Sequence, residues 1–262
     1  MALDLDGTLL SSNLTLSAEN VKAISETRNR GIVVAIATGR MTKAAVEATS
    51  ALGSDLPLAI YNGAMVRLGA EGPVVLKRPI PADDGARIVR FMWDWGIVFQ
   101  AHSDGELWVP RASRATADYE ARYGVTARVL NDIDGFIQLE AMKYLVIEPA
   151  NRVEAIQERL REVAGAGLRI MRSHPDMLEI VSANVSKGRA LRHLAEYYGI
   201  SMAETMAVGD SENDIDMLRE AGIAVAMGNA CDDIKGIADF VTGANDDHGV
   251  AMALQQFGLC GA

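Results

Sequence analysis

The run from Ile32 to Ala37 is continuously apolar, which is typical of a parallel β-strand buried on both faces of a sheet. It ends at Thr38-Gly39-Arg40, and a stretch with helical spacing follows through Ala44 and Ala48. The same order of apolar run, polar cluster and helix returns late in the chain, where Thr205–Gly209 precedes an acidic segment. This alternation predicts an α/β fold with a doubly wound parallel sheet.

The pattern changes near Pro79-Ile80-Pro81, where two prolines favour an extended connection of the kind found at domain boundaries. Mixed helix and strand patterns then continue to about residue 182, with Asp104-Gly105 as a hairpin signal between two strand-like segments. The first pattern resumes at Ser186-Lys187-Gly188. The sequence therefore predicts a core domain of residues 1–81 and 183–262, and an α+β domain inserted at residues 82–182.

Two acids lie close to the start of the chain, Asp4 and Asp6, followed by Gly7 and Thr8. Alternation along a strand would place both aspartates on one face, but Gly7 can adopt a positive φ and end the strand. The acids are therefore expected at the carboxyl end of a strand, the edge where ligands bind in open α/β sheets. Carboxylates at such an edge suit a divalent cation, and an aspartate can also attack phosphorus. Only three residues precede Asp4, so the strand is short for a central position, or the chain starts further upstream.

Polar residues follow other predicted strands in the same way. They are Thr38 with Gly39 and Arg40, Asn62 with Gly63, Lys187 at the start of a helix, and Asp210, Asn213 and Asp214 after Thr205–Gly209. Taken singly, Thr38 would be interpreted as a helix cap and Lys187 as a solvated surface residue, although the hydroxyl and backbone N–H of Thr38 could also bind a phosphate oxygen. Taken together, the acids would repel one another without a cation, so we expect Mg²⁺ between them. The whole set offers the nucleophile, the positive charge and the acid that phosphoryl transfer needs.

Composition excludes several other classes of protein. A formal net charge of −10, from 35 acidic and 25 basic residues, provides no general surface for a nucleic-acid partner. No apolar run is long enough for a membrane span, and the first residues lack the basic start of a signal peptide, so we expect a cytoplasmic protein without a membrane partner. Cys231 and Cys260 are too few for a disulfide framework. No sequence feature indicates the oligomeric state.

Four motifs in this order resemble those of the haloacid dehalogenase superfamily, and within it the Cof-type phosphatases. They are Asp4-Leu5-Asp6-Gly7-Thr8, Thr38-Gly39-Arg40, Ser186-Lys187-Gly188 and Gly209-Asp210-Ser211-Glu212-Asn213-Asp214. Further matches are Asn62-Gly63-Ala64, Ala226–Ala230 and Asp247–Ala251. The resemblance implies a Rossmann-like catalytic core, with the insert as a C2-type cap domain of subclass IIB that closes over the substrate and selects the leaving group.

The resemblance also implies a role for each matching residue. Asp4 would be the nucleophile that carries an aspartyl phosphate, and Asp6 the acid and base that serves the leaving alcohol and then water. Mg²⁺ would be held by Asp4, the backbone carbonyl of Asp6 and Asp210, with Asp214 as a ligand or a neighbour of the ligands. The catalytic set would be completed by Thr38 and Lys187. Phosphate and substrate would be bound by Gly7, Thr38, Gly39, Arg40, Asn62, Lys187 and Asn213, with Arg40 and Asn62 near the substrate mouth.

We therefore expect a Mg²⁺-dependent phosphatase that acts on a small phosphorylated metabolite. Two alternatives stay open: a phosphomutase of the phosphomannomutase type, which shares these motifs, and a regulatory module that binds Mg²⁺ or phosphate without turnover. The intact set of candidate catalytic residues argues against the regulatory module. The substrate itself is not readable, and sugar phosphates, pyridoxal phosphate and flavin mononucleotide all remain open by resemblance.

Overall fold

A computed structural model of the chain describes residues 1–103 and 105–261. The chain divides into two compact units, one formed by Met1–Leu76 with Ser186–Ala262 and the other by Lys77–Val185. These divisions fall within five residues of the boundaries predicted at 81/82 and 183. Within the described residues, no helix is long and apolar enough to cross a bilayer.

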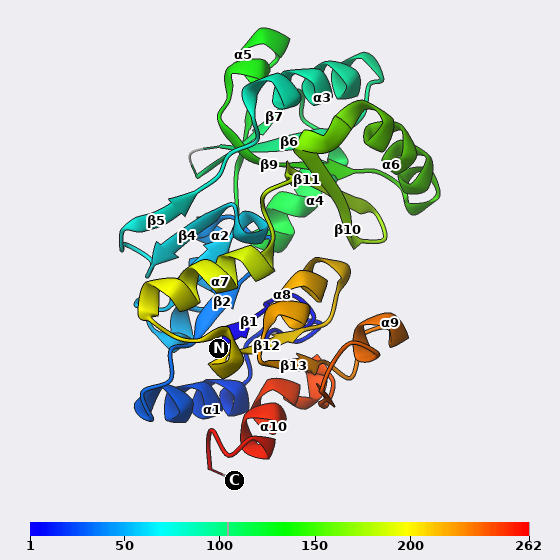
Figure 1. Ribbon diagram of the computed structural model, residues 1–262. Helices are drawn as coiled ribbons and strands as arrows, with labels where there is room; N and C mark the ends of the chain where they lie inside the picture. The colour runs from blue at the N-terminus through cyan, green and yellow to red at the C-terminus, as the bar shows by residue number, and fades with distance from the viewer. Residues whose placement is uncertain (104, 262) are drawn as a thin grey trace. The chain divides into compact units, whose positions relative to one another are not determined.

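The first unit is built on an eight-stranded sheet in the described part of the chain, in the order β14-β13-β12-β1-β2-β3-β4-β5 (Figure 1). Neighbouring strands from β14 to β3 are parallel, and β4 is antiparallel to β3. The strands are β1 (Ala2–Leu3), β2 (Ala35–Ala37), β3 (Pro57–Ile60), β4 (Met65–Leu68), β5 (Val74–Lys77), β12 (Met206–Gly209), β13 (Ile223–Ala226) and β14 (Phe240–Val241). This confirms the predicted doubly wound parallel sheet, to which β4 adds an antiparallel strand.

Helices cover both faces of the sheet, and the two faces differ in the size of their side chains. They are α1 (Ala18–Asn29), α2 (Thr42–Ala48), α7 (Lys187–Tyr198), α8 (Ile215–Glu220), α9 (Asp232–Lys235) and α10 (Gly249–Gln256). One face of the sheet is rich in alanine, including Ala35, Ala59 and Ala207, and packs with side chains of α7, α8 and α9. Small side chains there let the helices approach closely. Alternation turns larger residues such as Ile36 to the other side, and α1 and α10 pack against each other as a second helical layer (Figure 1).

The boundaries of α1 and α7 follow from local chemistry. Ser17 and Ser186 are N-caps whose hydroxyls accept hydrogen bonds from the backbone N–H of Asn20 and Arg189, at 3.2 Å each. Gly199 ends α7 in the left-handed conformation, with φ 67°. The cap at Ser186 matters for function, because it fixes the first turn of the helix at Lys187.

Strand β2 is shorter than predicted. The sequence indicated a strand over Ile32–Ala37, but β2 begins only at Ala35. The neighbouring β1 consists of Ala2 and Leu3, so residues 32–34 have little strand to pair with. Next to β1, the amino group of Met1 donates to the carbonyl of Val33 at 2.8 Å.

The second unit is an α+β fold around a six-stranded sheet in its described residues, in the order β10-β11-β9-β6-β7-β8 (Figure 1). The strands are β6 (Phe99–Ser103), β7 (Glu106–Val109), β8 (Ala127–Val129), β9 (Ala141–Ile147), β10 (Leu168–His174) and β11 (Met177–Ser182). The helices are α3 (Ala82–Asp94), α4 (Arg114–Tyr123), α5 (Ile133–Gln138) and α6 (Ala150–Ala164). The hairpin predicted at Asp104-Gly105 lies partly outside the described residues, because Asp104 is not among them.

An apolar core holds this second unit together. Phe99, Phe136 and Tyr144 are almost completely buried, and the ring of Phe99 meets those of Phe136 and Tyr144 edge-on, with centroids 5.3 and 6.4 Å apart.

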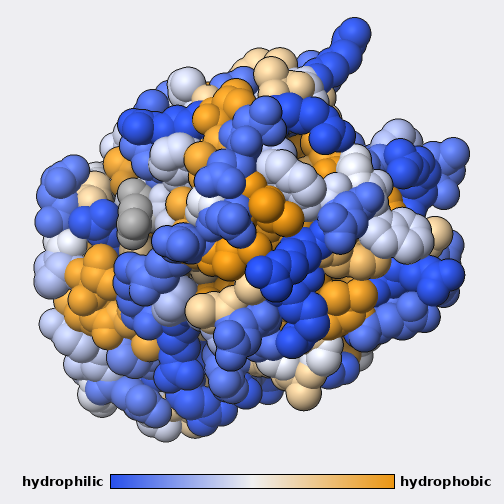
Figure 2. Space-filling model, turned by 90° about the horizontal axis from the view of Figure 1, so that it is seen from above, coloured by the Kyte–Doolittle hydropathy of each residue, from blue (hydrophilic) through white to orange (hydrophobic). Residues whose placement is uncertain are grey.

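Hydrophobic residues on the face of the protein seen in Figure 2 form separate patches among hydrophilic side chains. Such scattered apolar surface is ordinary for a folded domain.

Candidate active site

Three neighbouring parallel strands deliver polar residues to one edge of the core sheet. Asp4 directly follows β1, Thr38 follows β2, and Asp210 follows β12. Because β12, β1 and β2 are adjacent and parallel, their carboxyl ends lie side by side. Gly7 has φ 82°, so the chain turns away after the second aspartate. The structure thus brings together the strand ends that the sequence predicted.

Lys187 occupies the centre of this edge. Its side chain is fully buried, and Nζ donates to Oδ1 of Asp4 at 2.5 Å and to Oδ1 of Asp214 at 2.7 Å. An ammonium group at the start of α7 opposes the helix dipole, so nearby anions are needed to stabilise it. The two carboxylates supply that charge. The structure therefore rules out the interpretation of Lys187 as a solvated surface residue.

Asp4, Asp210 and Asp214 form an acidic cluster, in which one oxygen from each carboxylate lies within 4.8 Å of the others. Asp214 is already engaged on both oxygens. Its Oδ1 accepts from Lys187, and its Oδ2 accepts from the backbone N–H of Asp210 and Ser211, each at 3.0 Å. Asp214 therefore orients Lys187 and the loop that carries Asp210.

The charges of the cluster fit a divalent cation. When all three carboxylates are ionised, they face one ammonium group, which leaves an excess of two negative charges. Oxygen ligands of this kind are the ones that hard divalent ions prefer. The acidic cluster is thus a candidate metal site, with carboxylate oxygens of Asp4 and Asp210 as its donors.

The pKa values of the cluster express the same excess of negative charge. Burial first, and then the charge of Asp214, raise the pKa of Asp4 well above its ordinary value, while Lys187 opposes this shift. Burial and Asp214 raise the pKa of Asp210 to about 7, opposed by the hydroxyl of Thr8. Burial lowers the pKa of Lys187, but Asp214 and Asp4 outweigh it and raise that pKa overall. A bound cation would relieve the repulsion among the acids.

Two residues of the first loop are fitted closely to Asp210. The hydroxyl of Thr8 donates to Oδ1 of Asp210 at 2.9 Å. A Cβ atom at Gly7 would lie 2.4 Å from Oδ2 of Asp210, so only glycine fits there without displacing that carboxylate. The role of Thr8 was not predicted, although its place directly after Gly7 in the first motif was the available signal.

The side chain of Asp6 lies outside the acidic cluster and faces Arg40 instead. Nε of Arg40 donates to Oδ2 of Asp6 at 2.9 Å, and Nη2 donates to Oδ1 at 2.6 Å. Arg40 was expected near the substrate mouth, and its pairing with Asp6 was not predicted. The suggested metal contact of Asp6 through its backbone carbonyl stays a prediction.

The structure corrects one part of the expectation for Thr38. Its backbone N–H donates to the carbonyl of Ala59 at 2.8 Å, because the pairing of β2 with β3 continues to this residue. That N–H is therefore used within the sheet and cannot serve a phosphate oxygen. The hydroxyl accepts from the backbone N–H of Arg40 at 3.1 Å, and its own proton remains as a donor. Gly39 lies between these two residues at the same strand end.

A left-handed turn holds Asn62 in place. Tyr61, Asn62 and Gly63 have φ values of 53°, 59° and 93°, a conformation that costs about 1–3 kcal/mol for each residue other than glycine. A hydrogen bond of the turn offsets part of this cost, since Oδ1 of Asn62 accepts from Nδ2 of Asn213 at 3.1 Å. Two of the predicted substrate-binding residues, from distant parts of the chain, thus meet in a buried pair.

Asn229 is a further residue whose role the sequence did not reveal. Its Nδ2 donates to the carbonyl of Gly7 at 2.8 Å, and its Oδ1 accepts from the backbone N–H of Asn245 at 3.0 Å. It therefore links the first loop to the last loops of the core. The signals in the sequence were its position after a predicted strand and its place in Ala226–Ala230, which matches the family.

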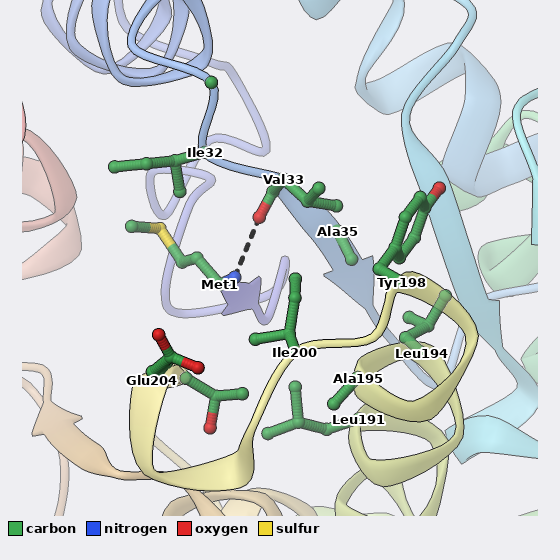
Figure 3. Close-up of a pocket in the computed structure, with 12 residues that line it drawn as sticks. Met1, Ile32, Val33, Ala35, Leu191, Leu194, Ala195, Tyr198, Ile200 and Glu204 are labelled. Atoms are coloured by element: carbon green, nitrogen blue, oxygen red, sulfur yellow. Dashed lines mark hydrogen bonds between the residues drawn. The ribbon is translucent and has the colours of Figure 1, made fainter.

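A cavity of about 210 Å³ lies at the opposite edge of the sheet, around Met1 (Figure 3). Most of its lining is apolar, including Ile32, Leu191 and Ile200, and Figure 3 shows these side chains around the amino group of Met1. Burial lowers the pKa of that amino group to about 6. The cavity adjoins the beginning of β1, whereas the acidic cluster follows its end, so the chemical groups described above do not face it.

Comparison with known proteins agrees with this geometry. The sequence profile of the haloacid dehalogenase-like hydrolases matches residues 1–254. A 5-amino-6-(5-phospho-D-ribitylamino)uracil phosphatase of Bacillus subtilis, YwtE, is 30% identical over 98% of this chain and 96% of its own length. The phosphoglycolate phosphatase of Archaeoglobus fulgidus is 31% identical over 99% of this chain and 96% of its own length.

Solved structures share the fold over almost the whole chain. The crystal structure of TM0651 from Thermotoga maritima is 33% identical with a TM-score of 0.85, covering 97% of this chain and 96% of that one. A haloacid dehalogenase-like hydrolase from B. subtilis is 30% identical with a TM-score of 0.89, covering 97% and 98%. Neither the phosphomutase nor the regulatory module is favoured by these comparisons. The chain belongs to the haloacid dehalogenase-like hydrolases and is a phosphatase of that family.

Proposed function

We propose that this protein is a Mg²⁺-dependent phosphatase that hydrolyses the phosphomonoester of a small metabolite through an aspartyl phosphate on Asp4. The observation that carries the proposal is the contact of Lys187 with both Asp4 and Asp214, beside Asp210. Lys187 donates a hydrogen bond to one oxygen of Asp4 and so orients the carboxylate. The other oxygen is then available as the nucleophile.

Each catalytic group has one task in the proposed reaction. An oxygen of Asp4 attacks the phosphorus, the bond from phosphorus to the leaving oxygen breaks, and Asp6 gives its proton to that oxygen. In the second half, water attacks the phosphorus of the aspartyl phosphate and gives a proton to Asp6, and the bond to Asp4 breaks. Alcohol and inorganic phosphate are released, and both aspartates return to their first state. Lys187 and the hydroxyl of Thr38 bind the phosphoryl oxygens throughout.

Mg²⁺ is the cation that we propose for the acidic cluster, held by Asp4, Asp210 and the backbone carbonyl of Asp6. When bound, it neutralises negative charge on the phosphoryl oxygens and on the attacking carboxylate. Asp214 takes no direct part, because both of its oxygens are used by Lys187 and by backbone N–H groups. It positions Lys187 and the loop of Asp210. Gly7 gives Asp210 the space to reach the cluster.

The substrate class follows from the named relatives and from the reaction. Both relatives quoted above are named for phosphate esters of small metabolites, a phosphorylated ribitylaminouracil and phosphoglycolate. We infer a small phosphorylated metabolite for this protein as well, with residues 82–182 as the cap that selects the leaving group. A screen of phosphorylated metabolites would identify it, and sugar phosphates, pyridoxal phosphate and flavin mononucleotide belong in that screen.

The test is turnover of p-nitrophenyl phosphate with and without Mg²⁺. We expect turnover that depends on added Mg²⁺ and is abolished by EDTA and by Asp4→Asn. Asp55→Asn is the matched control, because Asp55 is an exposed acid in a surface ion pair with Arg28. This control should keep wild-type turnover. Turnover that is insensitive to metal, or an active Asp4→Asn protein, would show that the proposed chemistry is wrong.

A further inference from the structure

Arg40 makes a geometrically exacting contact with Asp6. Two parallel hydrogen bonds, from Nε at 2.9 Å and Nη2 at 2.6 Å, join the planar guanidinium to both carboxylate oxygens. Such bidentate pairs restrict orientation as well as supplying energy. The side chain of Arg40 is 7% exposed and that of Asp6 is 35% exposed, so the buried partner can fix the more accessible one.

The backbone of the segment that carries Arg40 is itself held by the left-handed turn that follows β3. The N–H of Tyr61 donates to the carbonyl of Arg40 at 3.1 Å, and the N–H of Asn62 donates to the carbonyl of Thr38 at 2.9 Å. These two donors belong to the left-handed turn, whose positive φ values direct consecutive N–H groups at the 38–40 loop. A conformation that is costly for Tyr61 and Asn62 is thus used to hold the segment that presents Arg40.

We propose that Arg40 is a positioning residue for the general acid Asp6, which deepens the proposed function and rests on it. Asp6 projects from the loop that follows β1, where a carboxylate without a partner could adopt several rotamers. Arg40 selects one of them. A protonated Asp6 can still accept from Arg40 through its carbonyl oxygen, so the orientation persists while its O–H donates to the leaving oxygen.

This role makes a selective prediction about leaving groups. An alkyl phosphate releases a strongly basic alkoxide that needs the proton of Asp6, whereas p-nitrophenolate leaves without one. Positioned acid–base catalysis contributes roughly 10²–10⁴-fold, and a displacement of about 1 Å can cost roughly 10²-fold. Loss of Arg40 should therefore slow the cleavage of alkyl phosphates far more than that of p-nitrophenyl phosphate. Direct binding of the phosphoryl group by Arg40 would slow both esters equally.

The experiment compares kcat/KM for p-nitrophenyl phosphate and for an alkyl phosphate that the wild-type protein cleaves. In Arg40→Met we expect the ratio of alkyl to aryl kcat/KM to fall at least about tenfold. Arg40→Lys should recover part of the ratio, because lysine supplies the charge without the bidentate geometry. Arg28→Met is the matched control, since it removes a half-buried arginine of the same unit that pairs with Asp55 at 2.6 Å, away from the acidic cluster. That control should leave the ratio unchanged.

A second measurement separates positioning from damage to the fold. In an Asp6→Asn background there is no acid left to position, so adding Arg40→Met should change the alkyl to aryl ratio by less than about twofold. An equal loss for both esters in Arg40→Met, or a further fall of the ratio in the double variant, would overturn the proposal. Should the wild-type protein cleave neither ester, the proposed function fails and this inference fails with it.

Discussion

Replacement of Lys187 by methionine is the most informative single perturbation of the core. Lys187 is the buried cation between two almost completely buried carboxylates, at 2.5 Å from Asp4 and 2.7 Å from Asp214. Removing one partner of a buried ion pair costs about 3–5 kcal/mol, because the remaining charge has no compensation. For a chain of this size, that corresponds to a fall in Tm of about 6–20 °C.

The pH dependence of this loss has a definite sign. Lys187 opposes the rise in the pKa of Asp4 that burial and Asp214 produce, so its removal raises that pKa further. When a carboxyl group has a higher pKa in the folded protein than in the unfolded chain, the free energy of unfolding falls as the pH rises. For an aspartate, this fall begins at the unfolded pKa of about 3.9 and continues to the folded pKa. The deficit of Lys187→Met should therefore be greatest above neutral pH and should shrink toward pH 5.

The assay is urea unfolding in EDTA at pH 8 and at pH 5, with Lys22→Met as the control. Lys22 has a 68% exposed side chain and lies 3.9 Å from Glu26, a surface pair expected to contribute less than about 1 kcal/mol. Lys187→Met could be as stable as Lys22→Met at pH 8, or its loss of stability could grow toward pH 5. Either result would contradict the account of Lys187 as the buried partner of Asp4 and Asp214.

Three other predictions concern the same edge of the sheet. Asp4→Asn should abolish turnover while raising the free energy of unfolding in EDTA at pH 8, since repulsion with Asp210 and Asp214 falls; lower stability in urea unfolding would contradict this. Gly7→Ala should reduce kcat at least about tenfold through displacement of Asp210, because its Cβ would lie 2.4 Å from that carboxylate and its φ is 82°. The rise in Tm on adding Mg²⁺ should be larger at pH 8 than at pH 5.5, because protons compete with the cation for Asp210, whose pKa is about 7. Calorimetric scans that show an equal rise at both pH values, or a larger rise at pH 5.5, would contradict the proposed site.

The sequence was most informative where polar residues follow apolar runs, at the ends of strands. Short apolar runs followed by Asp4, Thr38 and Asp210 predicted the parallel sheet, and the order of strands then brought these residues to one edge. Periodicity carries that information because it reflects burial. Strands with mixed exposure escaped prediction for the same reason, as β5 shows, where Val74 and Lys77 are exposed and the apolar run is only three residues long.

Contacts between distant side chains were less accessible to prediction. Thr8 and Asp210 are 202 positions apart, and Arg40 and Asp6 are 34 apart. Which rotamers bring them together depends on the completed packing, so residue types alone suggested a shared site without indicating these pairs. The left-handed conformation of Tyr61 was also hidden, since an aromatic residue rarely adopts positive φ and only Asn62-Gly63 signalled a turn.

The central claim is that Asp4 accepts the phosphoryl group. Mass spectrometry of the acid-quenched Asp6→Asn protein, mixed with Mg²⁺ and p-nitrophenyl phosphate, tests this most directly, because loss of the base should let the covalent intermediate accumulate. We predict one phosphoryl group on the peptide that contains Asp4, and none when Asp4 is also replaced by asparagine. Phosphate on any other residue, or p-nitrophenol release without a phosphorylated protein at any time, would contradict the account.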